Sequence, residues 1–280
     1  MIHLDFRPRI WFARYQALIL GLISLGLVLV PGCHLIAPPI SNVHLTLGNP
    51  SQAKASLETP NNYLMEKSQY VLSYNRERGT ANWVSWQLNQ SWLGRVDRQD
   101  NFRPDESVPD GWYQVRPADY TGSGYDRGHL VASADRTRTQ EDNSATFLMT
   151  NIIPQTPDNN RNTWRQLEEY CRDLVKQGKE LYIVAGGSGY RRRLAQGKVT
   201  VPSYTWKVIV VLDQPGGGVG GITENTPVIA VLVPNQDNLK NWQQYQVSVD
   251  ELETVTGYDF LSNVSPKIQK VIEAKVTEKP

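Results

Sequence analysis

The sequence Tyr125-Asp126-Arg127-Gly128-His129 opens the stretch that decides the fold, and Arg172 closes it. Between them lie Thr150-Asn151-Ile152-Ile153-Pro154-Gln155, then Asn159-Asn160-Arg161-Asn162-Thr163-Trp164 and Glu168. A histidine, an asparagine, a glutamate and two arginines thus fall within about 45 residues, a separation that one strand–loop–helix unit can close. We expect this unit to carry the chemistry of the chain.

The end of this stretch has helical periodicity. Between about residues 163 and 177, apolar side chains recur at the spacing of one helix face: Trp164, Leu167, Cys171 and Leu174. We expect that face to pack on the core. A different face carries Arg161, Arg165, Glu168 and Arg172. Since Glu168 and Arg172 are four residues apart, a surface ion pair worth a few tenths of a kcal/mol is the alternative to a functional role.

The flanking segments predict a sheet. Runs at 70–74 and 83–88, separated by a charged turn at 75–79, are typical of a β-hairpin. Largely apolar runs at 181–186, 206–212 and 228–233 predict central strands.

Helix signals follow the strands. Ser248 and Glu251 have capping-box spacing, and Ser265-Pro266 favours the start of another helix. The polar, proline-containing segment 95–124 predicts a long surface loop. The fold class is therefore α+β, with a mixed or antiparallel central sheet, helices and long surface loops in one domain over residues 63–280.

The N-terminus is typical of a signal peptide, over residues 1–32. Three arginines precede an apolar run of fourteen residues, 17–30, which is short for a membrane span. The Val30-Pro31-Gly32-Cys33 sequence leaves three alternatives: lipid attachment at Cys33, plain cleavage nearby, or a retained anchor. Each places the remaining chain outside the cytoplasm. Residues 33–62 are rich in Pro, Asn and Ser, so we expect a disordered tether.

Charge and cysteine content limit the function classes. The formal net charge is +1, and without the predicted signal peptide 26 basic and 27 acidic residues remain. Binding of nucleic acid therefore requires a local basic surface. Arg191-Arg192-Arg193 is a candidate for one, with a solvated loop as the alternative. The two cysteines, Cys33 and Cys171, predict no disulfide and cannot build a structural zinc site.

Histidine is scarce, which makes one residue a candidate general base. His3 lies in the predicted signal peptide, and His34 and His44 lie in the predicted tether, so His129 alone falls in the predicted domain. Imidazole is the side chain whose ordinary pKa suits base catalysis near neutral pH. The alternative is a structural histidine with satisfied hydrogen bonds.

Asparagines near the helix are candidates for cation binding. The amide oxygen of Asn160 is a suitable ligand for Mg²⁺, with Asp158 as a competing ligand. Alternatively, Asn159 and Asn160 are turn or cap residues. Asn151 is a candidate for orienting substrate or bracing its loop.

Together these motifs resemble the DNA/RNA non-specific endonucleases, the ββα-metal nucleases with an Asp-Arg-Gly-His signature. The resemblance covers about residues 70–265 and depends on the order of the elements: the signature, then Asn151 to Gln155, then Asn160, Trp164 and Glu168. It implies a ββα-metal unit within the fold.

The resemblance also implies a role for each site residue. His129 is the general base, Asn160 is the direct protein ligand to Mg²⁺ or Mn²⁺, and Glu168 holds metal-bound water. Phosphate contacts and support of the site are implied for Arg127, Arg172 and Asn151. The arginine that stabilises the transition state aligns with Arg98, with Arg95 and Arg103 close by.

The implied function is a metal-dependent, sugar-non-specific endonuclease that cleaves DNA and RNA to 5′-phosphate products. Its expected partners are both nucleic acids and a dedicated protein inhibitor. Two alternatives differ in class: a catalytically silent, nucleic-acid-binding envelope lipoprotein, and a phosphodiesterase acting on small nucleotides.

Overall fold

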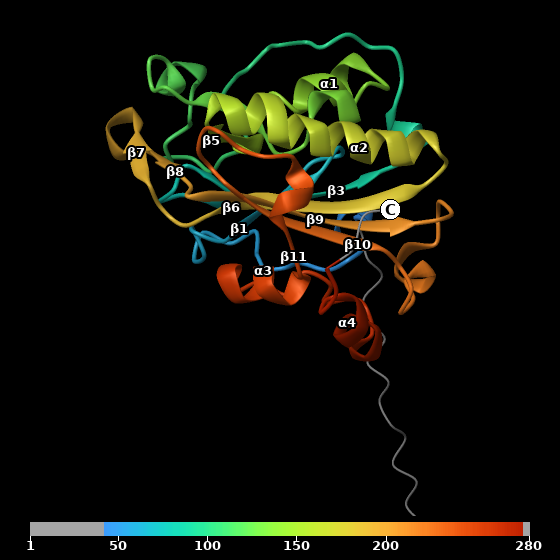
Figure 1. Cartoon of the computed structure of the whole chain (residues 1–280). Helices are drawn as coiled ribbons and strands as arrows, with labels where there is room; N and C mark the ends of the chain where they lie inside the picture. Colours follow the sequence, from blue (N-terminus) through green and yellow to red (C-terminus); the bar gives the residue numbers. More distant parts are fainter. Residues whose placement is uncertain (1–41, 277–280) are drawn as a thin grey trace, which may run out of the picture. The chain divides into compact units, whose positions relative to one another are not determined.

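A seven-stranded antiparallel sheet forms the centre of the computed structural model, which describes residues 42–276 (Figure 1). Its order is β1-β2-β3-β6-β9-β10-β11. The strands are β1 (Tyr63–Glu66), β2 (Val71–Asn75), β3 (Thr80–Leu88), β6 (Glu180–Ser188), β9 (Tyr204–Leu212), β10 (Val228–Pro234) and β11 (Gln246–Val247). The predicted hairpin and three central strands are confirmed, as is the α+β class with an antiparallel sheet.

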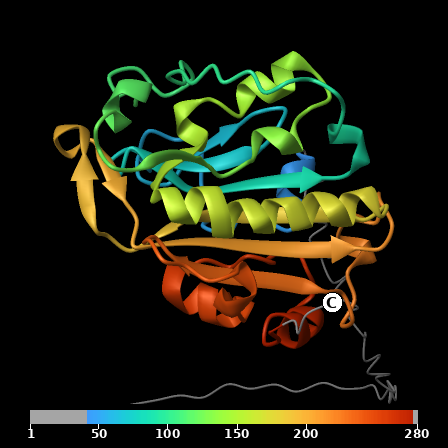
Figure 2. The ribbon, with the colours of Figure 1, turned by 45° about the horizontal axis from the view of Figure 1, so that its top comes forward.

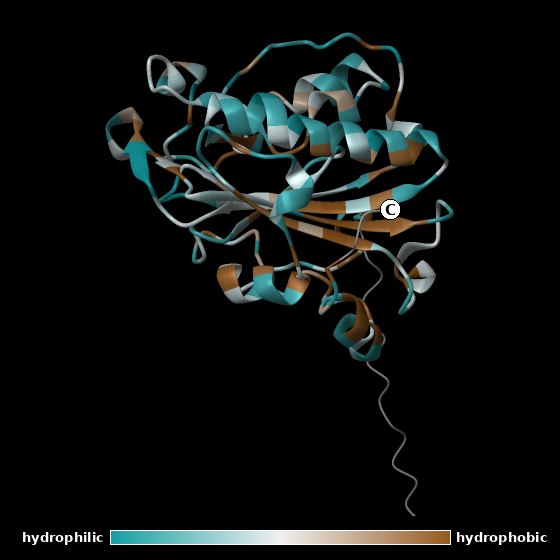
Figure 3. Ribbon diagram, in the orientation of Figure 1, coloured by the Kyte–Doolittle hydropathy of each residue, from teal (hydrophilic) through white to brown (hydrophobic). Residues whose placement is uncertain are grey.

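The central strands are apolar on both faces because helices cover both. In β9, Ile209 and Val211 pack in the core beneath α2 (Arg165–Lys176), whereas Val208 and Val210 pack in a second core. Beside that second core lie α3 (Val249–Thr256) and α4 (Pro266–Ile272). Figure 2 shows α2 running along the strands, and Figure 3 shows hydrophobic strands beneath its hydrophilic outer surface.

The predicted helix signals act as expected. The Ser248 side chain accepts a hydrogen bond from the Glu251 backbone N at 3.1 Å, and Pro266 is the first residue of α4. On α2, Leu167 and Cys171 are buried, and Leu174 packs partly buried against the same core. That stripe fixes which face of α2 remains outside.

Several short elements had no sequence prediction. These are α1 (Gln140–Ala145) and the hairpin of β7 (Arg192–Leu194) with β8 (Val199–Val201). The hairpin of β4 (Asp126–His129) with β5 (Ile152–Gln155) lies in the stretch for which a strand–loop–helix unit is expected. Segment 95–124 is a surface loop with one short 3-10 helix, η3 (Pro117–Tyr120).

The predicted tether is wrong for residues 42–62, which pack on the domain. Leu47 and Ala53 are buried in the second core, and Ser51 and Asn62 are joined by a 2.6 Å hydrogen bond. His44 is 2% exposed. Its Nε2 lies 3.0 Å from the Ser68 carbonyl and its Nδ1 accepts from Gln87 N at 3.1 Å. A local sequence rich in Pro, Asn and Ser gave no sign of these distant contacts. His44 is therefore a second histidine of the folded part, with a structural role.

The predicted signal peptide, Cys33 and the rest of the tether lie outside the described residues. Within residues 42–276, no helix combines the length and apolar character needed to cross a lipid bilayer.

Candidate active site

The β4–β5 hairpin and the helix after it form one unit. In the antiparallel pairing, His129 lies opposite Ile152 and Gly128 opposite Ile153. A π-helical turn, η6 (Asn159–Trp164), leads directly into α2. The Trp164 indole Nε1 donates to the His129 carbonyl oxygen at 3.2 Å, which ties the helix to the strand. The expected strand–loop–helix unit is therefore present, with a wider first turn than a regular helix.

Gly128 allows a side chain to pass close under β4. A Cβ atom at this position would clash with the side chain of Gln155, which is fully buried. Only glycine leaves that space, so the residue before His129 is required for the close approach of the two strands.

His129 lies at the end of β4, and its ring packs in one cluster with two phenyl groups that also contact each other. Its ring centroid is 5.3 Å from that of Phe102 and 4.9 Å from that of Phe147. The residue is 8% exposed, and Nε2 is buried without a hydrogen-bond partner among the described residues. Burial, followed by the charges of Arg98 and Arg127, lowers the pKa of His129 to about 3. The ring is therefore neutral and has an uncommitted nitrogen.

The orientation of the Asn160 amide is set by Asp126. Asn160 Nδ2 donates to Asp126 Oδ2 at 2.9 Å. Arg161 donates to both oxygens of the same carboxylate, at 2.7 and 2.6 Å. Although burial opposes it, hydrogen bonds from Arg161 and Asn160 lower the pKa of Asp126. A carboxylate only accepts, so the amide nitrogen must face it and Oδ1 is the atom left to bind a ligand.

Glu168 lies two turns after Asn160 along the helix, is half-buried, and feels the charge of the buried Lys207. Lys207 on β9 is 1% exposed, with its Nζ 4.3 Å from the centre of the Trp164 ring and 5.5 Å from that of Trp86. Burial raises the pKa of Glu168 to about 7, and the Lys207 charge opposes that rise. Lys207 therefore favours the carboxylate form of Glu168.

Arg172 does not form the surface ion pair considered as an alternative. Its Nη1 instead donates at 3.0 Å to Asp135, whose other oxygen accepts from the Trp86 indole at 3.3 Å. Asp135 is buried, so the Arg172 guanidinium is fixed from behind.

Arg98 and Arg127 line the same cleft as His129. The Arg98 guanidinium lies 4.7 Å from the centre of the Phe147 ring and donates to Ser133 Oγ at 2.9 Å. The Arg127 guanidinium lies 4.4 Å from the centre of the Phe102 ring. Arg103, by contrast, donates to the Ser144 carbonyl at 2.8 Å. Arg98, and not Arg103, therefore lines the cleft.

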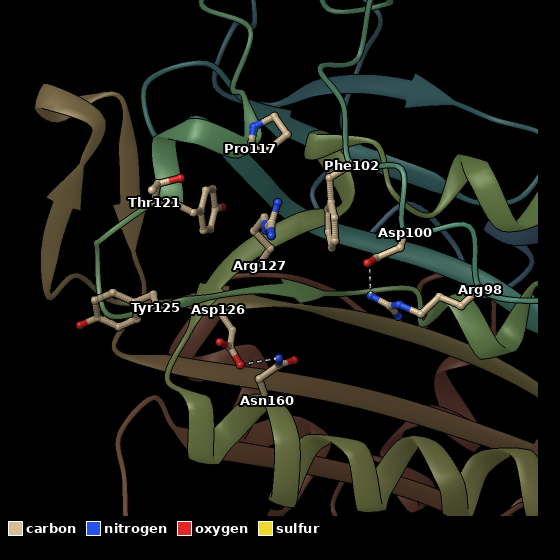
Figure 4. A pocket seen from close by; sticks show the side chains of 10 residues that line it. Arg98, Asp100, Phe102, Pro117, Thr121, Tyr125, Asp126, Arg127 and Asn160 are labelled. Atoms are coloured by element: carbon tan, nitrogen blue, oxygen red, sulfur yellow. Dashed lines mark hydrogen bonds and ion pairs between the residues drawn. The ribbon is translucent and has the colours of Figure 1, made fainter.

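One cleft collects six of the seven predicted site residues. Its lining includes His129, Asn160, Glu168, Arg98, Arg127 and Arg172. A neighbouring pocket shares Arg98, Arg127 and Asn160 and adds Phe102 and Tyr125. Figure 4 shows the Arg127 side chain in this pocket above Asn160, with Arg98 on one side and Tyr125 on the other.

Asn151 lies behind the cleft and braces the backbone. It is fully buried, and its side chain exchanges hydrogen bonds with both the N and O of Val131 at 2.9 and 3.0 Å. Its Nδ2 also donates to the Thr146 carbonyl at 2.8 Å. Of the two roles considered for Asn151, the structure favours bracing, just after His129.

Other candidates lie elsewhere. Asp158 accepts from the Leu239 backbone N at 2.8 Å and from Asn162, so its oxygens are engaged away from the cleft. The Arg191-Arg192-Arg193 side chains diverge, to the Asn235 carbonyl, the Ser123 carbonyl and Glu77.

Sequence reasoning missed Asp126 and Lys207 as supporting residues. Asp126 belongs to the signature itself, but its partner Asn160 is 34 positions away, so no local signal indicated the pairing. Lys207 interrupts an otherwise apolar strand, Trp206 to Leu212, and a charge at such a position indicates a buried partner.

The donor set suits a hard divalent cation. The uncommitted oxygen of Asn160 and the carboxylate of Glu168 line the same cleft, and oxygen ligands are those that Mg²⁺ and Mn²⁺ prefer. The three predicted arginines are among five that line the same cleft, and guanidinium groups match the charge and planar geometry of phosphate.

Comparisons with known proteins agree with this geometry. The family described as DNA/RNA non-specific endonuclease matches residues 48–267, which begins within the predicted tether. A nuclease of Nostoc sp. (strain PCC 7120 / SAG 25.82 / UTEX 2576) is 66% identical over 248 residues, covering 88% of this chain and 90% of that protein. Human mitochondrial endonuclease G is 33% identical over 215 residues, covering 72% and 70% respectively.

A solved structure has the same fold. The crystal structure of the EndoG/EndoGI complex aligns with a TM-score of 0.67 at 26% identity, covering 83% of this chain and 96% of that one.

Proposed function

The chain belongs to the DNA/RNA non-specific endonuclease family and is a phosphodiester hydrolase; from this premise we propose that it cleaves both DNA and RNA, single- or double-stranded, to 5′-phosphate products. The observation that carries the proposal is the convergence of His129, Asn160, Glu168 and three arginines on one cleft.

We assign His129 as the general base. Its neutral ring has an unpartnered Nε2, which can take a proton from water. The charges of Arg98 and Arg127 are among the causes of its low pKa. A bound phosphate would neutralise those guanidiniums, so the basicity of the ring would rise when substrate enters.

The family uses a divalent metal, and we propose Mg²⁺ or Mn²⁺ held directly by Asn160. When bound, such an ion supplies Lewis-acid charge to the phosphate and the leaving oxygen. Glu168 would accept hydrogen bonds from its water shell. Asp126 would keep the Asn160 oxygen aimed at the ion by holding the amide nitrogen.

The arginines would bind substrate without reading sequence. Contacts from Arg98, Arg127 and Arg172 to phosphate carry no base information. Nothing in a water-derived nucleophile requires or excludes a 2′-hydroxyl. Cleavage of both DNA and RNA follows from these two points.

Digestion of supercoiled plasmid and of RNA by the purified protein tests the proposal. We expect both to be cut with Mg²⁺ or Mn²⁺ and neither with EDTA. Activity that survives chelation would remove the metal from the proposal. Binding without cleavage in either metal would favour the silent lipoprotein, and cleavage of dinucleotides alone would favour the small-nucleotide phosphodiesterase.

We also propose an extracytoplasmic location and a dedicated protein inhibitor. The location is supported by the sequence of residues 1–33, and mass spectrometry of the mature N-terminus would show whether Cys33 carries lipid. The inhibitor is supported by the structural neighbour, which was solved as a complex of EndoG with EndoGI.

A further inference from the structure

Carboxylates gather where α3 meets the end of α4, on the opposite side of the sheet from the cleft. Asp250 and Glu253 are on α3, and Glu273 caps the C-terminus of α4. One carboxylate oxygen from each of these residues lies within 4.8 Å of the others. The Asp250 backbone N donates to the Glu273 carbonyl oxygen at 3.2 Å, which holds the two helix ends together.

Glu273 is the buried member of this acidic cluster. The residue is 7% exposed, and its Oε1 is buried with no hydrogen-bond partner among residues 42–276. It also lies at the electronegative end of α4, where a negative charge is unfavourable. Burial, followed by the charges of Glu253, Asp250 and Asp259, raises the pKa of Glu273 to about 7.

The described protein supplies no cationic side chain to balance these acids. None of the ion pairs found within residues 42–276 includes Asp250, Glu253, Asp259 or Glu273. Two lysines of this region are directed elsewhere: Lys267 pairs with Glu224 at 2.9 Å, and Lys275 donates to the Glu224 carbonyl oxygen at 3.0 Å.

We propose that Asp250, Glu253 and Glu273 bind a second, structural cation, Ca²⁺. Oxygens that ligate one Ca²⁺ at about 2.3–2.6 Å are no more than about 5 Å apart, as these are. Ca²⁺ accepts irregular carboxylate sets, whereas Mg²⁺ demands near-octahedral geometry and zinc prefers nitrogen and sulfur. Asp250 is exposed, so water can complete the coordination shell.

The bound ion joins the last described helix to the domain. Val249 and Leu252 of α3 and Ile272 of α4 are buried in the same core, directly beside the acidic cluster. Replacing carboxylate repulsion with coordination stabilises the packing of both helices there. The site acts on stability and takes no part in hydrolysis.

Calcium titration of the full chain tests the site. An Asn160→Ala background removes the proposed active-site ligand, so that calorimetry reports the second site alone. We expect one Ca²⁺ per chain in that variant and none after adding Glu273→Gln. At free Ca²⁺ about 100 times Kd, the Tm of the Asn160→Ala variant should rise by about 5–10 °C. The Tm of the double variant that also carries Glu273→Gln should not change.

A matched control is Glu251→Gln, an exposed acid on the same turn of α3 that should leave binding intact. Should Glu273→Gln fail to fold, Glu253→Gln gives the same test at a half-buried position. Equal binding with and without Glu273→Gln, or no binding at millimolar Ca²⁺, would overturn the proposal. Activity in Mg²⁺ of Glu273→Gln alone should match wild type, so this result is independent of the proposed function.

Discussion

The two faces of the central sheet bury different kinds of side chain. Beneath α2, charged Lys207 and Asp135 are buried close to the cleft, whereas the core beside α3 and α4 is filled by apolar residues such as Leu252 and Phe260, with the buried acid Glu273 beside it. Burying an ion costs several kcal/mol unless partners compensate. Both faces supply hydrophobic stabilisation, but the face beneath α2 also pays the cost of holding charges next to the proposed active site.

The largest difference between the two faces of the sheet is expected in the rate of hydrolysis. We expect His129→Ala to lower kcat by about 10³–10⁴-fold because the proposed general base is lost. Its melting temperature should stay close to that of wild type, which thermal unfolding would show. A variant within tenfold of wild type would remove His129 as the base.

Leu252→Ala should show the reverse behaviour. Leu252 is fully buried in the second core, so its truncation should reduce the free energy of unfolding by about 2–5 kcal/mol. Urea unfolding measures this loss, and kcat of the folded variant should change less than threefold. Leu167→Ala, equally buried but on α2, should reduce both quantities. Equal kinetic effects of the two variants would break the comparison.

Asp126→Ala tests whether the amide of Asn160 needs orienting. We expect the metal dependence of the rate to shift to roughly 10–100-fold higher Mg²⁺ concentrations, as is usual when a partner of a metal ligand is removed. Arg161→Met is the control, because its exposed ion pair with the same carboxylate contributes little. Should both variants respond alike, the charge of the pair rather than the amide orientation matters.

The smallest expected effect is on the pH profile. Because the pKa of Glu168 is raised to about 7, kcat/KM at low Mg²⁺ should fall as pH decreases through that value. Higher Mg²⁺ should move this limb to lower pH, since metal and proton compete for the carboxylate. The residual activity of Glu168→Gln should lack the limb. A limb that persists in Glu168→Gln would assign it to another group.

Features with a local signal were predictable. The apolar stripe of α2 and the runs that form β6, β9 and β10 carry their periodicity in neighbouring residues, and the structure confirms them. The candidate site residues were proposed from their order along the chain, and the structure brings six of the seven to one cleft.

Features that depend on contacts between residues far apart in the sequence could not be predicted. Residues 42–62 have a composition typical of a tether, yet Ser85 and Gln87 of β3 bind the backbone and ring of His44. The pairing of Asp126 with Asn160 spans 34 positions and has no local pattern. Likewise, nothing near Lys207 predicts that two tryptophans from other elements would enclose it.

The π-helical turn η6 determines on which side of the helix Asn160 and Glu168 lie relative to each other. On a regular α-helix, residues eight apart differ by about 80° around the axis. A turn that closes over one more residue reduces that offset, which brings Asn160 and Glu168 toward the same side. Deleting a single residue there would restore a regular α-helix, in which residues seven apart differ by only about 20°, so the two side chains would still share one side. An eight-residue spacing therefore requires the wider turn, and relatives in which the two residues are seven apart should have a regular helix at this point.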